Sequence, residues 1–144
     1  MNTDPLVFEY LYRAPAGRVW SAITEAPLLR RWLFEQIPAF KPEPGSYTEF
    51  SVVFEGKHFL HQWTVLEAVP ATRLVVRWRY AGYSGDSRTI WELSEAEGLT
   101  KLTLTVEGLE SFPQNIPEFT RESCTAGWTF LLGSRLNTFL EELS

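Results

Sequence analysis

Hydrophobic and polar residues alternate with a period of two along much of the chain up to residue 107. In the segment 73–81 the even-numbered residues are apolar, whereas Arg77 and Arg79 stand between them. This alternation is typical of a strand that buries one face and exposes the other to water. Strand-like composition predicts six strands: Leu6–Arg13, Tyr47–Phe54, Phe59–Val69, Arg73–Ala81, Ser87–Ser94 and Thr100–Glu107.

Short turn sequences separate the last five predicted strands. They contain Gly56, Pro70, Gly82 and Gly98, residue types that favour tight reversals of the chain. Connections this short cannot hold a crossover helix between parallel strands. Neighbouring strands are therefore expected to pair antiparallel, as a meander.

Helical spacing predicts two short helices after the first strand. Residues 18–24 have apolar side chains at helical spacing. Thr24 is expected to cap the second short helix, with Pro27 in its first turn. Three prolines in residues 38–45 predict a loop before the second strand.

A long helix is predicted from about Pro117 to Leu143. Its apolar residues fall on one helical face: Trp128, Leu131, Leu132, Leu136, Phe139, Leu140 and Leu143. Gly127 and Gly133 each cost about 1 kcal/mol relative to alanine inside a helix. We expect them either to relieve crowding against the sheet or to leave room for another group.

The apolar face of one sheet needs a cover, and the C-terminal helix carries the longest apolar stripe. We therefore predict an α+β helix-grip fold. A curved six-stranded antiparallel sheet wraps around the C-terminal helix, and the two short helices close one end. The chain length suits a single domain spanning residues 1–144, and such a fold often leaves a gap between sheet and helix.

Composition excludes several classes of protein. Hydrophobic residues make up 44% and charged residues 22%, values that rule out a disordered chain. The net charge is −5 and the basic residues are scattered, so we expect no nucleic-acid partner. No apolar run approaches the roughly 18 residues of a membrane span. A single cysteine and no signal-peptide pattern favour a soluble cytoplasmic protein, and nothing indicates a cofactor.

Three stretches carry a resemblance to a known family. Residues 15–34 contain its Val-Trp-x-x-x-Thr opening and a second helix ending in Trp, and residues 69–78 its Pro-x-x-Arg-Leu-Val-x-x-Trp strand. Residues 89–105, with Gly127-Trp128 and Leu131-Leu132, are similar to its closing hairpin and Gly-Trp helix. The chain thus resembles the START-like (SRPBCC, Bet v 1-like, helix-grip) superfamily. Within it, the chain is most similar to the family of the activator of Hsp90 ATPase homologue C-terminal domain.

The resemblance implies a cavity for a small hydrophobic ligand, or a protein-binding domain like the co-chaperone that activates Hsp90. It implies no shared catalytic residues, although cyclases, dehydratases and hydrolases occur in the superfamily. A small hydrophobic molecule, a chaperone or another protein is the expected partner, and the chain is expected to be a monomer or homodimer. Trp63 stands where the family often has glycine, so any pocket should be narrowed.

Residues on the predicted inward faces are the candidate lining of a cavity, because ligand pockets combine apolar rings with a few polar tips. Among them, Trp32 and Phe34 are expected at its mouth. The same side chains form a packed core if the space is filled, and both alternatives stay open. The candidates are Trp32, Phe34, Phe50, His61, Trp63, Trp78, Tyr80, Thr89, Trp91, Trp128 and Leu132.

The titratable residues offer no catalytic or metal-binding constellation. His58 and His61 are three apart on a strand, so they should lie on opposite faces and cannot hold one metal ion. His61 is expected inside, as a satisfied core histidine or a ligand contact. Glu49 is expected on the outer face, and only a bulge would bring it inside as a base or anchor. Cys124 is expected to be a small buried hydrophobe rather than a reactive thiolate.

Overall fold

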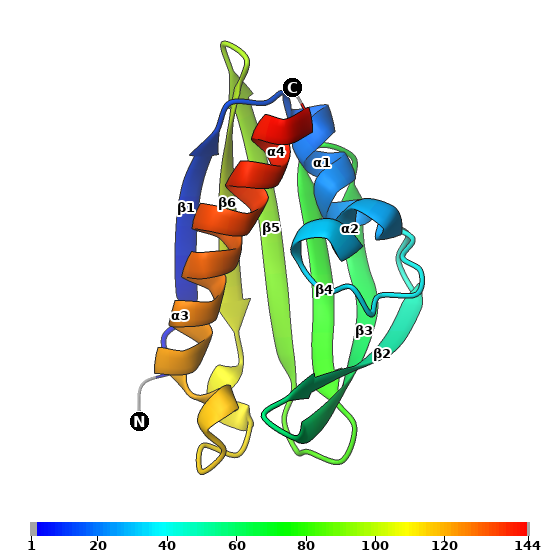
Figure 1. Ribbon diagram of the computed structural model, residues 1–144, viewed down its shortest axis with the longest axis vertical. Helices are drawn as coiled ribbons and strands as arrows, with labels where there is room; N and C mark the ends of the chain where they lie inside the picture. The colour runs from blue at the N-terminus through cyan, green and yellow to red at the C-terminus, as the bar shows by residue number, and fades with distance from the viewer. Residues whose placement is uncertain (1–2, 144) are drawn as a thin grey trace.

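In the computed structural model, which describes residues 3–143, six strands form one antiparallel sheet of order β1-β6-β5-β4-β3-β2 (Figure 1). Their bounds are β1 Leu6–Tyr12, β2 Tyr47–Phe54, β3 Lys57–Val69, β4 Arg73–Tyr80, β5 Ser87–Ala96 and β6 Leu99–Glu107. All six predicted strands are confirmed, within two residues at each end. The sheet is the predicted meander, with β1 paired to β6 at one edge.

The β2–β3 and β5–β6 hairpins turn more tightly than predicted. Glu55 and Gly56 have φ values of 49° and 80°, and Glu97 and Gly98 have 54° and 78°. Positive φ at both central residues is the signature of the two-residue type I′ turn, whose twist matches that of the strands. The strands therefore extend into the segments that were predicted as longer turns.

Helices cover the concave side of the sheet, as predicted. Two short ones follow β1: α1 (Ala16–Thr24) and α2 (Ala26–Trp32). The long C-terminal helix comprises α3 (Arg121–Phe130), a π-helical stretch (Leu131–Leu136) and α4 (Asn137–Leu143). Figure 1 shows this helix running diagonally in front of the β1–β6–β5 side, with α1 and α2 beside its C-terminal end.

Two predicted helix starts were wrong. Pro117 begins a separate 3₁₀ turn (Pro117–Phe119), and Thr120 caps α3 by accepting a hydrogen bond from the Ser123 N–H at 3.2 Å. Proline suits the first turn of either helix type, which is why the sequence signal was ambiguous. Thr24 does not cap α2, because its hydroxyl donates to the Trp20 carbonyl at 2.6 Å and Glu25 is the N-cap residue.

The π-helical stretch is fitted to the first strand. The buried Tyr12 hydroxyl donates to the Leu132 carbonyl at 2.7 Å. A Cβ on Gly133 would lie 3.1 Å from the ring of Tyr10, whereas one on Gly127 would meet nothing within 4 Å. Gly133 therefore relieves crowding against β1, which is the first of the two alternatives predicted for this glycine. π-helical geometry commonly marks local adjustments of this kind.

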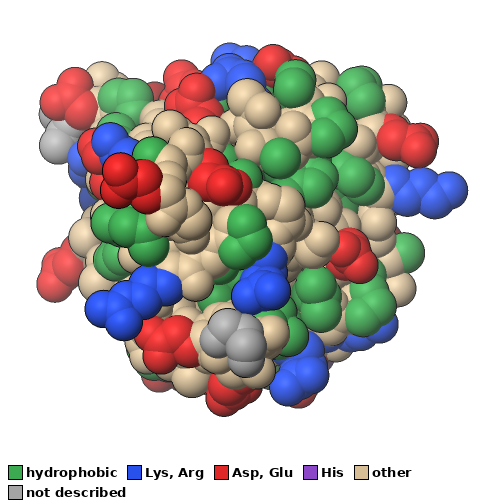
Figure 2. Space-filling view, turned by 90° about the horizontal axis from the view of Figure 1, so that it is seen from above, with side chains coloured by type: hydrophobic (Ala, Val, Ile, Leu, Met, Phe, Trp, Pro, Cys, Tyr) green, Lys and Arg blue, Asp and Glu red, His purple; other side chains and the backbone are tan. Residues whose placement is uncertain are grey.

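Charges are distributed over the surface without a patch of one sign at the end drawn in Figure 2. This end is seen from above, and acidic and basic side chains there are interspersed with apolar ones. Between residues 3 and 143, no helix is long and apolar enough to cross a membrane.

Gly108, just after β6, supplies a test of the packing at the lower end of the sheet. Gly98 and Gly108 both have positive φ, 78° and 88°, but only Gly108 is crowded, since a Cβ there would lie 2.4 Å from the Asp86 carbonyl oxygen. We expect Gly98→Ala to cost about 1–2 kcal/mol through backbone strain alone. Gly108→Ala should cost a further 1–3 kcal/mol, roughly, through overpacking. Urea unfolding measures both, and equal losses would contradict the crowding.

Candidate functional site

The rings on the concave side form one connected cluster, here called the inner aromatic cluster. Trp78 lies at its centre, with ring centroids 4.9 Å from Trp63, 5.5 Å from His61, 6.2 Å from Phe34 and 5.9 Å from Trp128. The other rings join through these. The cluster comprises Trp32, Phe34, Phe50, His61, Trp63, Trp78, Tyr80, Trp91 and Trp128.

The structure brings the remaining two predicted residues to the same interior. The Thr89 hydroxyl accepts a hydrogen bond from the Trp91 indole N–H at 3.1 Å. Leu132 is fully buried and belongs to the same hydrophobic core. The sequence prediction therefore identified a set that lies together in space.

Side chains nearly fill the space between sheet and helices. A cavity of about 10 Å³ is bounded by Trp63, Trp78 and Trp91, with residues of α1 and α2 and Phe40. A second cavity, of about 40 Å³, lies between Trp78, Tyr80 and Trp128. Pockets for drug-sized ligands occupy about 300–1,000 Å³. The interior thus has room for about one or two waters, and Trp63 is part of the lining of the smaller cavity.

Phe34 is the member of the cluster that is not on a strand or helix. It lies just after α2, in a segment of residues 33–46 that forms neither. Its ring is half-buried, and the ring centroid lies 5.1 Å from that of His61, 5.6 Å from that of Phe50 and 6.4 Å from that of Trp63. A loop side chain therefore occupies the middle of the space enclosed by β2, β3 and β4.

The mouth of the interior is formed differently from the prediction. Trp32 is fully buried, and its indole N–H donates to the Ala22 carbonyl at 2.8 Å, which ties α2 to α1. A surface groove of about 610 Å³ instead lies between α1, α2 and residues 38–42. Phe40 lines both this groove and the 10 Å³ cavity, and its ring meets Trp63 edge-on at 6.1 Å. Phe40 thus separates the groove from the interior, a role that sequence reasoning missed.

Two of the buried tryptophans lack hydrogen-bond partners. Trp63 and Trp78 are 4% and 7% exposed, and neither indole N–H has an acceptor within hydrogen-bonding distance among residues 3–143. Burial raises the pKa of the Tyr80 hydroxyl, and the nearby Trp78 indole opposes this rise, although the geometry of the two groups falls short of a hydrogen bond. A buried donor left unpaired costs about 1–3 kcal/mol. The two N–H groups are therefore the least satisfied polar atoms described in the interior.

His61 is the one titratable imidazole of the cluster. It is 5% exposed, and its Nδ1 lies 3.0 Å from the Phe59 carbonyl oxygen. A carbonyl can only accept, so Nδ1 carries the proton and Nε2 remains an acceptor. Burial lowers the pKa of His61 to about 4, so the ring is neutral at pH 7. His58 is exposed on the other face, which confirms the predicted opposite orientation.

The other two candidate reactive side chains, Glu49 and Cys124, lack the surroundings that a general base or a nucleophile needs. Glu49 is exposed on the outer face, as expected, and accepts a hydrogen bond from the Tyr47 hydroxyl at 2.7 Å. Cys124 is half-buried, and burial raises the pKa of its thiol to about 11. The thiol therefore stays protonated at pH 7 and is a poor nucleophile.

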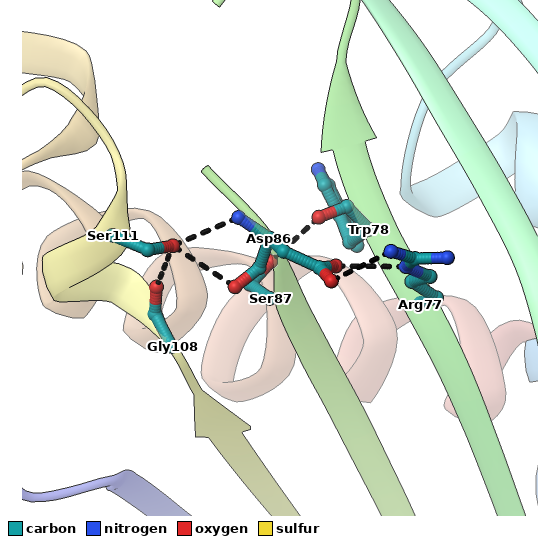
Figure 3. A network of polar contacts seen from close by, with 6 residues as sticks. All are labelled: Arg77, Trp78, Asp86, Ser87, Gly108 and Ser111. Carbon is teal, nitrogen blue, oxygen red and sulfur yellow. Dashed lines mark hydrogen bonds and ion pairs between the residues drawn. The ribbon is translucent and has the colours of Figure 1, made fainter. Parts of the chain in front are cut away.

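A polar network fixes the end of β4 that carries Trp78 (Figure 3). The Ser87 hydroxyl donates to the Trp78 carbonyl at 2.8 Å. Next to it, the Arg77 guanidinium donates twice to the Asp86 carboxylate, at 2.9 and 2.8 Å, and lowers the pKa of that carboxyl. The Ser111 hydroxyl accepts from the Asp86 N–H at 2.8 Å. The Ser87 hydroxyl thus holds the backbone of Trp78, and the exposed Arg77–Asp86 ion pair braces the adjacent position on β4.

Comparison with known proteins agrees with this fold. The family model described as Activator of Hsp90 ATPase homolog 1-like protein matches residues 13–141. No curated protein matches the sequence. Three solved structures illustrate the likeness, and they show the helix-grip fold.

CV1439 from Chromobacterium violaceum is 24% identical with a TM-score of 0.81, over 96% of this chain and 97% of that one. Mll3558 from Rhizobium loti is 21% identical with a TM-score of 0.80, over 95% and 96% of the two chains. DynU16, a protein of the dynemicin biosynthetic locus, is 25% identical with a TM-score of 0.73. That match covers 97% of this chain and 48% of DynU16.

Proposed function

This chain belongs to the Activator of Hsp90 ATPase homolog 1-like family, and from that premise we propose that it binds a small, mainly apolar molecule within the inner aromatic cluster. The observation that carries the proposal is the position of Phe34. A half-buried ring from an irregular segment packs against rings of β2, β3 and β4 in a cluster whose other members are held on strands and helices. A ligand ring could take its place without disturbing the sheet.

The segment that carries Phe34 is suited to local opening. Between residues 34 and 44 the backbone hydrogen bonds are short-range, such as the Ile37 N–H to the Phe34 carbonyl at a long 3.4 Å, and the side chains of Arg30 and Thr48 hold two further carbonyls. Segments outside the hydrogen-bond ladders of helices and strands open at a lower free-energy cost than the whole fold. Movement of Phe34 and Phe40 together would join the outer groove to the interior and leave a space bounded by aromatic rings.

The ligand class follows from the lining. Apolar rings dominate the cluster, and the polar contributions are the hydroxyl of Thr89, the neutral His61 and two indole N–H groups. Sites of this composition favour uncharged molecules with one or two rings over ions, because no charged side chain is buried there among the described residues. The likeness to a protein from a biosynthetic locus fits a small-molecule ligand. We place the protein in the cytoplasm, where its lone cysteine stays reduced.

Titration of the wild-type protein with a panel of uncharged one- and two-ring compounds, namely aromatic hydrocarbons, phenols and ketones, tests the proposal. Quenching of tryptophan fluorescence measures binding, because the cluster contains five indoles. We expect one molecule to bind per chain. Phe34→Ala should raise the affinity for the best ligand about tenfold by removing the competing ring, an effect of about 1.4 kcal/mol. Phe54→Ala, at an exposed ring on the β2–β3 hairpin, is the matched control and should leave affinity unchanged.

The wild-type result decides the outcome. Binding by the Phe34→Ala variant alone would show a cavity made by the substitution and would contradict the proposal. Failure of the whole panel to bind the wild-type protein, or to shift its melting temperature, would also contradict it.

A further inference from the structure

We propose that Trp63 and Trp78 act as a pair of hydrogen-bond donors that selects ligands carrying a neutral acceptor oxygen, such as aryl ketones. The inference rests on the proposed function, because it concerns the same interior. It goes further by assigning specificity to two named atoms, the Nε1 atoms of the two indoles.

The two tryptophans are adjacent on the inner face. They are directly opposite in the β3–β4 register, and their ring centroids are 4.9 Å apart. Both rings line the 10 Å³ cavity. Strand pairing thus places two buried indole rings on the border of one space, and the Ser87 hydroxyl holds the backbone of one of them through the Trp78 carbonyl.

Two other tryptophans of the cluster show that this fold can provide a buried indole N–H with a hydrogen-bond acceptor. Trp91 donates to Thr89 within its own strand, and Trp32 donates to the Ala22 carbonyl of α1. Trp63 and Trp78 have no such acceptor among the described residues, although they are more than nine-tenths buried. Buried polar groups without partners are uncommon and mark places where another group binds. A ligand atom is the partner that accounts for both at once.

The required partner is a neutral acceptor. An indole N–H can only donate, so the ligand must offer a lone pair. A carboxylate is disfavoured, because no lysine or arginine among residues 3–143 is buried to balance its charge. Ketone, ester and amide oxygens satisfy both conditions, and each has two lone pairs that two donors can share. The nearby Nε2 of His61 adds an acceptor for a hydroxyl on the same ligand.

A matched pair of probes isolates the acceptor. 2-Acetylnaphthalene and 2-ethylnaphthalene have nearly the same shape and differ at the carbonyl oxygen. We expect the wild-type protein to bind the ketone at least tenfold more tightly, because the hydrocarbon leaves both donors unpaired. In ¹⁵N-labelled protein the ketone should move the indole N–H signals of Trp63 and Trp78 downfield. The ethyl compound should not produce that shift.

Substitutions assign the effect to the two rings. Trp63→Phe and Trp78→Phe should each reduce the ketone preference, measured as the ratio of the two Kd values. Tyr47→Phe is the control, since it removes a polar hydrogen that binds Glu49 on the exposed outer face of the sheet, and it should leave the ratio unchanged. Circular dichroism confirms that each variant is folded. The indole signals of the wild-type protein give the same answer independently of any variant.

The outcomes separate this inference from the proposed function. Equal binding of the two naphthalenes without an indole shift would overturn the donor pair and leave the proposed function standing. A ketone preference that survives both substitutions would also overturn the assignment to Trp63 and Trp78. If neither probe nor any other apolar compound binds, the proposed function fails and this inference fails with it.

Discussion

Replacing Trp128 by alanine is expected to destabilise the protein by about 3–5 kcal/mol. The ring is 8% exposed and lies edge-on to Trp78 and Trp91, with centroids 5.9 and 5.5 Å away. It is the contact through which α3 closes over β4 and β5. Its removal therefore leaves a void beside the 40 Å³ cavity that the rigid sheet cannot close, which adds to the lost burial.

Urea unfolding measures this loss, with the midpoint and slope compared against the wild-type protein. Phe130→Ala is the matched control, because that ring is on the same helix and is 56% exposed. It should change the free energy of unfolding by less than about 0.5 kcal/mol. If Trp128→Ala is equally mild, Trp128 borders open space instead of the packed interior, and the description of a filled cavity is wrong.

Acidification is expected to destabilise the protein by about 3 kcal/mol through His61 alone. Burial lowers the pKa of the folded-state imidazole to about 4, from an ordinary value of 6.5. Between these values the unfolded chain takes up the proton and the folded protein does not. Stability therefore falls as pH decreases from about 6.5 to about 4, and the contribution is constant outside that window.

The comparison of variants isolates this effect from the carboxylates, which titrate in the lower part of the same range. His61→Phe keeps a ring stacked on Phe50, at 4.8 Å in the native protein, but cannot be protonated. Its free energy of unfolding should lose less on going from pH 7 to pH 4 than that of the wild-type protein, by about 3 kcal/mol. His58→Phe, on the exposed face, should retain the wild-type dependence. An unchanged pH profile in His61→Phe would show that His61 titrates normally.

Local periodicity explains why the interior was predictable. Side chains on a strand alternate strictly, so the sequence alone placed His61, Trp63 and Trp78 on one face and Glu49 and Arg77 on the other. The strand bounds and the C-terminal helix followed from the same kind of pattern. Because the C-terminal helix carries the longest apolar stripe, it was predicted to cover the apolar face of the sheet, which gives the helix-grip fold.

What the sequence could not supply depends on contacts between distant segments. Phe34 and Phe40 are in a loop without periodicity, so nothing local shows that one ring enters the interior while the other covers it. The partner of an indole N–H is equally hard to foresee. Trp91 finds Thr89 two residues away on the same face, but Trp32 uses a carbonyl on another helix. Phe112, buried next to Tyr80, comes from a connection with Pro113 and Asn115 that gave no helix or strand signal. Phe119, also next to Tyr80, lies in the 3₁₀ turn that was predicted as the start of the long helix.

The pairing of the first strand has a consequence for the order of folding. Leu6 pairs with Val106, and the Tyr12 hydroxyl binds the Leu132 carbonyl, so β1 needs partners made much later in synthesis. As the chain emerges from the ribosome, strands β2 to β5 can pair in sequence early. Strand β1 stays unpaired until β6 and the last helix have been synthesised. Such non-local pairing slows folding and leaves a strand edge open in the meantime. Closure of the ends is therefore the expected late step in folding, and nascent chains that end before β6 expose the Leu6–Tyr12 edge to other proteins.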